Sequence, residues 1–215
     1  MSDRAPSRLE GLDRDELGRG YSPSAGRNQR DVVAALVAEL PACGVCLELA
    51  SGTGEHAVLA AERLPGWRWF PTDRDDEALA SIQAWVDHAG LGNLAAPKRL
   101  DLTEPWTRAP ASLDAVFASN LTHIAPLSTS AALFAGCATS LRPSGPLLVY
   151  GPIFLSGEAA AQGNLDFDRE LRERDAELGV RRQEELESLA GDAGLRLASV
   201  RRMPRNNAML RFEWA

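Results

Sequence analysis

The stretch Glu48-Leu-Ala-Ser-Gly-Thr-Gly-Glu-His56 decides the fold of this 215-residue chain. It begins inside an apolar run, 45–50, that predicts a buried strand, and it leads into a helical pattern over 54–64. Small residues at such a turn let the backbone approach a ligand closely, and the first amides of the following helix point toward that ligand. The stretch therefore predicts a strand–turn–helix unit with a ligand site at the carboxyl end of the strand.

Strands and helices alternate on either side of this unit. A helix over 26–40, ended by Pro41, comes before the first strand. Downstream we expect strands over 67–71, 97–102, 113–120 and 146–151, and helices over 75–89 and 128–141. This alternation predicts a Rossmann-like, doubly wound α/β fold with a mostly parallel sheet and helices on both faces.

The C-terminal region departs from the alternation. Helical patterns over 167–177 and 182–193 are followed by two apolar runs, 195–203 and 208–214, which Pro204-Arg-Asn-Asn207 joins. A connection this short cannot cross over between parallel strands, so it predicts a C-terminal antiparallel hairpin.

Length and local composition indicate one domain preceded by a short arm. Residues 1–24 are rich in Pro, Gly, Ser and charge and have no apolar period, so we expect an N-terminal arm there. Residues 25–215 have a suitable length for a single core and a single active site.

Composition limits the classes of partner. The net charge is −7 and Lys98 is the only lysine, which argues against nucleic acid, since phosphates require clustered cations. The arginines of the last third of the chain, Arg181 among them, alternate with acids as on a solvated helix face. No apolar run approaches the roughly 18 residues of a membrane span, and the N-terminus is polar, so we expect a cytoplasmic protein with a small-molecule substrate. Cys43 and Cys46 are expected to be buried structural thiols, without a metal.

Two cofactors fit the glycine-rich turn. Gly52-Thr-Gly-Glu-His-Ala57, with Asp73 about 20 residues further on, satisfies the dinucleotide pattern and would suit an NAD(P)-dependent oxidoreductase. Glu48 opposes that interpretation, because a nearby anion disfavours a pyrophosphate at the helix N-terminus. S-adenosylmethionine (SAM) has no phosphate and carries two cationic groups, so an acid beside the turn suits it. The helix before the first strand and the terminal hairpin also favour SAM.

Further motifs extend the pattern over residues 21–212. In chain order they are Arg27-Asn28, Glu48 to His56, Phe70-Pro-Thr-Asp73, Ser81-Ile-Gln-Ala-Trp85, Leu100-Asp-Leu102, Trp106, Ser119-Asn-Leu-Thr-His-Ile-Ala-Pro126, Tyr150-Gly-Pro152, Asn164-Leu-Asp-Phe-Asp168 and Met203-Pro-Arg-Asn-Asn207. In this order and spacing the chain resembles class I SAM-dependent methyltransferases, in the variant of the uncharacterised methyltransferase-like-26 family. The resemblance implies seven strands, the last antiparallel, and SAM as cofactor. Ala50 departs from the class, because most members have the first glycine of the turn there.

Several residues are candidates for holding the cofactor. Asp73 ends a strand, where its carboxylate can accept both ribose hydroxyls; the alternative is a helix N-cap. By analogy with the class, Asp101 and Leu102 would meet adenine, unless Asp101 is a plain loop residue. Arg27 and Asn28 could fold over SAM, with Arg27 on its carboxylate, or cap the first helix. The expected cofactor set is completed by Glu48, Ala50, Gly52, Gly54 and Asn120.

The predicted reaction centre is Asn120 with His123. Methyl transfer is an in-line displacement in which the protein chiefly contributes alignment, and a base is needed only if the nucleophile carries a proton. His123 could be that base, or a structural histidine that bonds a loop carbonyl.

The remaining polar candidates are assigned to the acceptor. His56, neutral at a helix start, and Tyr150 could line its pocket, although Tyr150 could instead serve packing. Asn164, Asn206 and Asn207 are expected in loops, where they suit a neutral polar substrate; turn chemistry explains the last two equally well.

The sequence therefore favours a SAM-dependent methyltransferase with a small-molecule acceptor. A SAM-binding protein with a regulatory or non-methylation role is the first alternative, and an NAD(P)-dependent oxidoreductase is the second.

Overall fold

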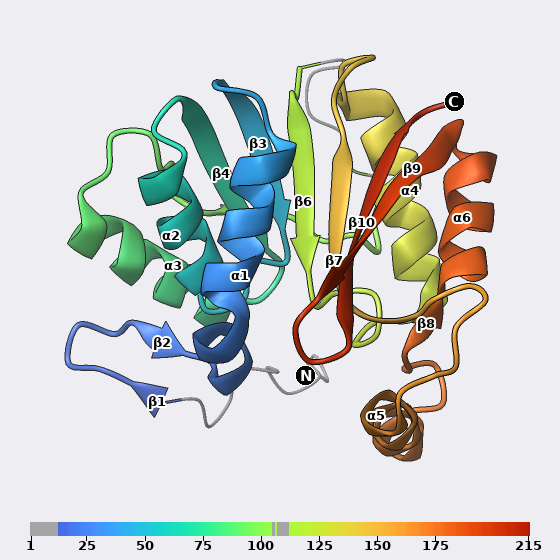
Figure 1. Ribbon diagram of the computed structural model, residues 1–215. Helices are drawn as coiled ribbons and strands as arrows, with labels where there is room; N and C mark the ends of the chain where they lie inside the picture. The colour runs from blue at the N-terminus through green and yellow to red at the C-terminus, as the bar shows by residue number, and fades with distance from the viewer. Residues whose placement is uncertain (1–12, 105, 107–111) are drawn as a thin grey trace. The chain divides into compact units, whose positions relative to one another are not determined.

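A computed structural model describes residues 13–104, 106 and 112–215 of the chain (Figure 1). Residues 1–12 of the predicted arm lie outside this description. The chain divides into two compact units: one runs up to Cys43 and resumes over Glu48–Leu100, and the other consists of Gly44–Leu47 and Asp101–Ala215. Strand β3, Gly44–Leu49, contributes residues to both units.

The first unit is built around the predicted strand–turn–helix. Its other elements are β1 (Asp13–Arg14), β2 (Gly20–Tyr21), α1 (Pro23–Glu39), α2 (Glu55–Arg63), β4 (Trp67–Asp73), α3 (Asp76–Ala89) and β5 (Lys98–Arg99). Helix α1 buries Val32, Val33 and Leu36 on one stripe and packs against α2. Asp75 caps α3, since its side chain accepts the amides of Glu77 and Ala78.

The second unit contains the rest of the sheet. Its elements are β6 (Ala115–Ser119), α4 (Leu127–Ser140), β7 (Leu147–Phe154), α5 (Gln162–Arg174), β8 (Arg181–Arg182), α6 (Gln183–Asp192), β9 (Leu195–Met203) and β10 (Asn207–Trp214). Strand β6 pairs with β7 in parallel, and β10 pairs antiparallel with both β7 and β9. Helix α6 packs against α4 and β9 (Figure 1).

The main sheet has the strand order β5-β4-β3-β6-β7-β10-β9, with the short β8 beside β7. The order reverses at β3, because the chain goes on to β4 and β5 on one side and to β6 and β7 on the other. In open α/β sheets ligands bind outside the carboxyl ends of the strands at such a reversal. The predicted fold class is confirmed: an α/β fold with a mostly parallel sheet of seven main strands and a C-terminal antiparallel hairpin.

The hairpin turn has the geometry that its sequence favours. Arg205 and Asn206 are both left-handed, with φ of 61° and 59°, and the amide of Asn207 bonds the carbonyl of Pro204. Two consecutive left-handed residues define the mirror-image turn whose twist matches that of antiparallel strands. The connection is therefore as tight as expected.

The structure differs from the sequence-based elements in short segments. Strands β1, β2 and β8 have two residues each and were not predicted; the strand expected over 97–102 is confined to Lys98–Arg99. Helix α5 begins at Gln162, five residues before the expected start at 167. Cys46 is buried as expected, but Cys43 is exposed. No helix within the described ranges is long and apolar enough to cross a membrane.

Candidate functional site

The turn after β3 is held in a left-handed path. Ala50, Gly52 and Gly54 have φ values of 52°, 60° and 95°. A Cβ on Gly54 would lie 3.1 Å from the Cα of Ile82, whereas one on Gly52 would meet nothing within 4 Å. The turn is thus packed at Gly54 and open at Gly52, where a ligand can reach the backbone. Ala50 adopts its conformation at a steric cost, because a Cβ disfavours positive φ.

Asp73 lies directly against this turn. Its Oδ2 accepts the amide of Gly52 at 2.9 Å, and its Oδ1 accepts the amide of Asp75 at 3.0 Å. Burial raises the pKa of Asp73, although these amide bonds favour the carboxylate. The alternative of Asp73 as N-cap of α3 is wrong, since Asp75 has that role. Each carboxylate oxygen retains a lone pair for a further donor.

Glu48 is buried beneath the turn at the end of β3. The indole Nε1 of Trp69 donates to its Oε2 at 2.8 Å, and the hydroxyl of Thr72 donates to its backbone carbonyl at 2.7 Å. Burial raises the pKa of Glu48 to about 7, while hydrogen bonds from Trp69 and Ser51 lower it in part. Glu48 is therefore an acid close to half-ionised at neutral pH.

Two polar residues, Glu55 and Ser81, which stand in quoted motifs but were assigned no role, tie the N-terminal segment to the turn. Glu55 Oε2 accepts the amide of Ser22 at 2.7 Å and the hydroxyl of Thr53 at 2.9 Å. Ser81 Oγ accepts the amide of Gly20 and donates to the carbonyl of Thr53, both at 2.7 Å. Residues 20–22 of the predicted arm are thus bound to the turn. Ser81 lies within a quoted motif, but spacing alone does not predict its distant partner.

Arg27 and Asn28 lie inside α1, beyond its first turn, and not at its cap. Ser22 occupies the N-cap position, which also excludes the capping alternative. Asn28 Oδ1 lies 2.9 Å from His56 Nε2, and since an amide oxygen only accepts, Nε2 carries the proton. Burial lowers the pKa of His56 to about 4, so the ring is neutral at pH 7. Arg27 is exposed.

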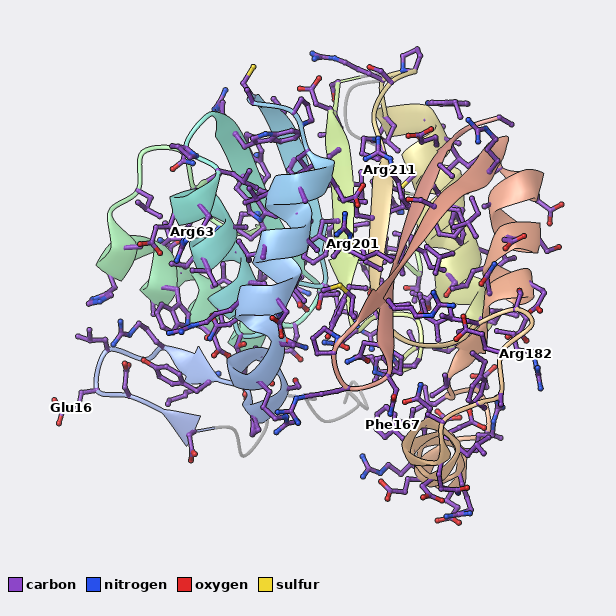
Figure 2. The ribbon with its side chains drawn as sticks, in the orientation of Figure 1. Glu16, Arg63, Phe167, Arg182, Arg201 and Arg211 are labelled. Atoms are coloured by element: carbon purple, nitrogen blue, oxygen red, sulfur yellow. The ribbon has the colours of Figure 1, made fainter. Side chains whose placement is uncertain are left out.

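In the second unit, Asn120 and His123 converge on Gly151. A Cβ on Gly151 would lie 3.4 Å from His123 Nδ1 and 3.7 Å from Asn120 Oδ1. Asn120 is left-handed, with φ of 55°, and its amide bonds the carbonyl of Tyr150 at 2.8 Å. The His123 ring is buried and meets the edge of Phe167, labelled in Figure 2, at a centroid distance of 5.5 Å. The structure thus brings the predicted pair together.

Arg181 holds the loop that carries His123. Its guanidinium donates to the carbonyls of Thr122 at 2.9 Å, Ala125 at 2.6 Å and Glu177 at 2.7 Å. The His123 carbonyl accepts the amide of Gly179 at 3.0 Å, so a structural role for its backbone is also present. The expectation of Arg181 on a solvated face is wrong, because the residue is 5% exposed. The sequence pattern did not predict this burial, because Arg181 lies in a region where arginines alternate with acids as on an exposed helix face.

The other acceptor candidates form a connected group in the same unit. The Asn207 side chain donates to the Tyr150 hydroxyl at 3.0 Å, and the Asn164 side chain donates to the Asn206 carbonyl at 2.9 Å. Asn164 lies in the first turn of α5, so its expected place in a loop is wrong. Tyr150 is 1% exposed, which agrees with the packing alternative.

Asp101 and Leu102 come shortly after β5 in the chain and belong to the second unit. Asp101 Oδ1 accepts the amide of Thr103 at 2.9 Å and its hydroxyl at 2.8 Å. Asp101 thus closes a turn, as the loop alternative expects, and Leu102 is buried. Among the described side chains, no group of three or more His, Cys, Asp or Glu is placed to hold a metal ion.

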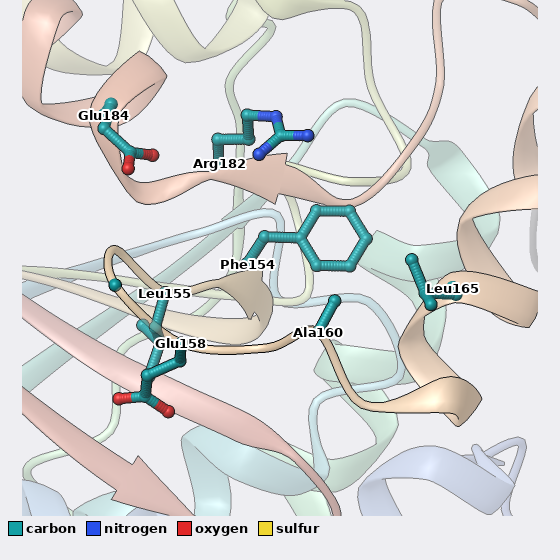
Figure 3. Close-up of a pocket in the computed structure, with 8 residues that line it drawn as sticks. Phe154, Leu155, Glu158, Ala160, Leu165, Arg182 and Glu184 are labelled. Carbon is teal, nitrogen blue, oxygen red and sulfur yellow. The ribbon is translucent and has the colours of Figure 1, made fainter.

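Two adjoining cavities of about 240 and 300 Å³ lie in the second unit. They share the lining residues Phe154, Leu155, Glu158 and Ala160. The smaller, drawn in Figure 3, is completed by Gly157, Leu165, Arg182 and Glu184. The larger is completed by Ile153, Ala159, Ala161, Asn164, Arg202, Met203, Arg205, Asn206 and Asn207. The three asparagines that the sequence assigned to the acceptor, Asn164, Asn206 and Asn207, therefore all line the larger cavity.

Several solved structures that are similar in fold are described as methyltransferases. CalO1, a methyltransferase in calicheamicin biosynthesis solved with bound S-adenosylhomocysteine, has a TM-score of 0.72 at 21% identity, over 89% of this chain and 54% of that one. Human N-acetylserotonin methyltransferase in complex with SAM has a TM-score of 0.72 at 15% identity, over 89% and 53%. A putative sarcosine dimethylglycine methyltransferase from Galdieria sulphuraria has a TM-score of 0.68 at 15% identity, over 95% and 92%.

At these identities the likeness concerns the fold, and this chain spans about half the length of the first two proteins. A family model matches residues 19–214, which is nearly the whole chain. The chain therefore belongs to the family described as protein of unknown function, DUF938.

Proposed function

We propose that this chain is a SAM-dependent methyltransferase that acts on a small-molecule acceptor. The observation that carries the proposal is the hydrogen bond between the Asp73 carboxylate, at the end of β4, and the amide of Gly52, in the turn after β3. Gly52 has open space around it that a ligand can enter. The fold agrees with it, since structural neighbours were solved with S-adenosylhomocysteine or SAM. The finer kinship with methyltransferase-like-26 proteins rests on the order of the motifs and is part of the proposal.

The residues around the turn fit SAM better than a dinucleotide. Gly52 leaves the backbone open, and the Asp73 oxygens have lone pairs for ribose hydroxyls. Glu48 adds an acid where a pyrophosphate would need donors, and a cationic ligand nearby would favour its ionised form. We assign Arg27 to the methionine carboxylate, with Asp101 and Leu102 at adenine and Asn120 at the methionine part. SAM, when bound, supplies a methyl group on a cationic sulfur.

We assign the acceptor to the second unit. Asn120 and His123 share the space at Gly151, which has no side chain to fill it. Where the attacking atom of the acceptor carries a proton, the His123 imidazole takes it, since histidine is the side chain that titrates nearest neutral pH. The protein otherwise contributes alignment, which is worth up to roughly 7–11 kcal/mol.

Equilibrium binding of SAM and NAD, followed by thermal shift, tests the choice of cofactor. We expect the unfolding midpoint to rise with SAM concentration and to stay unchanged with NAD. Stabilisation by NAD alone would overturn the assignment. A panel of oxygen, nitrogen and sulfur nucleophiles, with S-adenosylhomocysteine as the readout, then tests transfer. Tight SAM binding without product from any nucleophile would leave a SAM-binding protein that does not methylate.

A further inference from the structure

We propose that the two adjoining cavities of the second unit bind a small molecule with an apolar ring and a carboxylate, which Arg182 holds. This inference rests on the proposed function in one respect only, namely that the ligand bound here is the methyl acceptor. The binding site itself is argued from the lining of the cavities, within one unit. We call it the Phe154 cavity, after the ring shared by both.

The floor of the Phe154 cavity is apolar. Phe154 lies between Arg182 on one side and Ala160 and Leu165 on the other (Figure 3). The Leu165 side chain is 42% exposed, which is high for a large apolar residue beside an aromatic ring. Ligand pockets typically combine such apolar walls with a few fixed polar groups. A flat apolar ring would remove both Phe154 and Leu165 from water.

The asparagine side chains do not decide the charge of the ligand. The amide nitrogen of Asn164 is bonded to the Asn206 carbonyl, and that of Asn207 to the Tyr150 hydroxyl and the Pro204 carbonyl. These donors therefore hold the hairpin turn onto β7 and α5. The neutral polar substrate that the sequence favoured loses its main support, because two of the three amides are committed to the fold.

The charged side chains of the lining carry a positive excess. Three arginines line the cavity, Arg182, Arg202 and Arg205, together with two acids, Glu158 and Glu184. Glu158 pairs with Arg202, so this arginine is neutralised. Of the remaining charged residues, Arg182 and Glu184 line the smaller cavity and Arg205 lines the larger one, in a chain whose net charge is −7. An anionic ligand is thus favoured locally even though the protein as a whole repels anions.

Among the interactions of the described residues, Glu184 and Arg182 form no hydrogen bond or ion pair, although the charge of Arg182 helps to lower the pKa of Glu184. Hydrogen bonds from its own backbone and from Ser156 are the leading causes that lower the pKa of Glu184, ahead of the charge of Arg182. The Arg182 guanidinium carbon lies 5.9 Å from the centroid of the Phe154 ring. A guanidinium that lies over a ring keeps its N–H edge for a carboxylate, which it binds through two parallel hydrogen bonds. Ring and carboxylate can therefore be held by adjacent groups of the same cavity.

The test compares benzoate with benzamide, its uncharged isostere, by ligand-observed NMR titration of the full chain. We expect benzoate to bind about fivefold tighter, a modest factor because the arginine is exposed. The Arg182→Gln variant should bind both probes equally. The matched control is Arg174→Gln, an exposed arginine of α5 that does not line the cavity; it should keep the preference. The preference should also shrink as salt is raised.

Equal binding of the two probes to the unsubstituted chain would overturn the proposal. So would a benzoate preference that survives in Arg182→Gln, with folding of the variant verified by circular dichroism. SAM binding, measured separately, keeps the two proposals apart. Arg182-dependent benzoate binding without SAM binding would refute the proposed methyltransferase function and leave the anion site. SAM binding without Arg182-dependent benzoate binding would refute only the anion site.

Discussion

Asp73 joins the two features that carry the proposed cofactor site. One carboxylate accepts both the turn amide of Gly52 and the amide of Asp75, two residues beyond the end of β4. Asp73→Ala should weaken SAM binding by about 1–3 kcal/mol, measured by calorimetry, because charge-assisted hydrogen bonds contribute about that much. The matched control is Asp75→Ala, which removes the α3 cap and about 1 kcal/mol of stability but leaves SAM affinity unchanged. Unchanged affinity in Asp73→Ala would remove Asp73 from the site.

Ala50 carries backbone strain that glycine would relieve. Its φ of 52° lies in the left-handed region, where a Cβ costs about 1–2 kcal/mol, while glycine gives up roughly 0.5–1 kcal/mol in chain entropy. Ala50→Gly should therefore raise the free energy of unfolding by about 0.5–1 kcal/mol in urea titrations. Gly52→Ala, at a φ of 60° with open space around it, should lower the free energy of unfolding by a similar amount. Equal stability of all three proteins would show that the turn is unstrained.

At the scale of elements, the sequence predicted what periodicity can encode. The long strands and helices have clear apolar periods, and β9 matches its expected bounds of 195–203. Strands of two residues, such as β8, have no period, because pairing with a neighbour alone defines them. The start of α5 was missed because its first turn has few apolar residues.

The sequence predicted the site residues that are close together in the chain, but it missed contacts between residues that are far apart in the chain. Asn120 and His123 were predicted as a pair because they are three residues apart. Arg181 lies more than fifty residues from the carbonyls of Thr122 and Ala125, and only folding brings them together. Local spacing likewise could not show that the Asn164 amide is used by the hairpin turn.

Arg181 should control the order of the loop between β6 and α4. Its guanidinium donates to the buried carbonyls of Thr122 and Ala125 and to the part-buried carbonyl of Glu177. Leaving a buried acceptor unpaired costs about 1–3 kcal/mol. Arg181→Met should therefore lower the free energy of unfolding by about 2–4 kcal/mol and speed amide exchange of His123 and its neighbours. Exchange is followed by mass spectrometry.

Arg169→Gln is the control for this prediction, because Arg169 is exposed and pairs with Asp166 on its own helix. It should leave the free energy of unfolding within about 0.5 kcal/mol of that of the unsubstituted chain. The amide exchange rates of the loop should stay unchanged. If Arg181→Met exchanged at the same rate across residues 121–126, the loop would hold its shape without the guanidinium.

At the scale of the whole molecule, two buried groups give opposite pH dependences. The pKa of Glu48 is about 7 in the folded chain against an ordinary 4.5. Its contribution to the free energy of unfolding is therefore fully present below pH 4.5 and is lost as pH rises to 7, because the unfolded chain releases the proton first. The folded pKa of His56 is about 4 against 6.5, so the unfolded chain binds the extra proton between these values and stability falls as pH falls. The two effects oppose each other between pH 4.5 and 6.5.

Glu48→Gln separates these effects, since an amide oxygen can still accept the Trp69 indole proton. Its free energy of unfolding, relative to the unsubstituted chain, should rise by about 2–3 kcal/mol between pH 4.5 and 7. For His56→Gln, the same difference should rise as pH falls from 6.5 to 4. Urea titrations at a series of pH values measure both, and a flat difference for Glu48→Gln would mean that its carboxyl has an ordinary pKa.

The division of β3 between the two compact units bears on how the chain unfolds. Gly44–Leu47 belongs to one unit and Glu48–Leu49 to the other, so neither unit contains the whole of β3. We therefore expect one cooperative transition, as for the single domain predicted over 25–215. Tryptophan fluorescence, to which Trp67 and Trp69 in the first unit contribute, and far-ultraviolet circular dichroism should give the same midpoint. SAM, whose proposed ribose ligand Asp73 lies in the first unit, should then shift both signals equally with concentration. A fluorescence transition that moves with SAM while part of the dichroism signal does not would instead identify two independently folding domains.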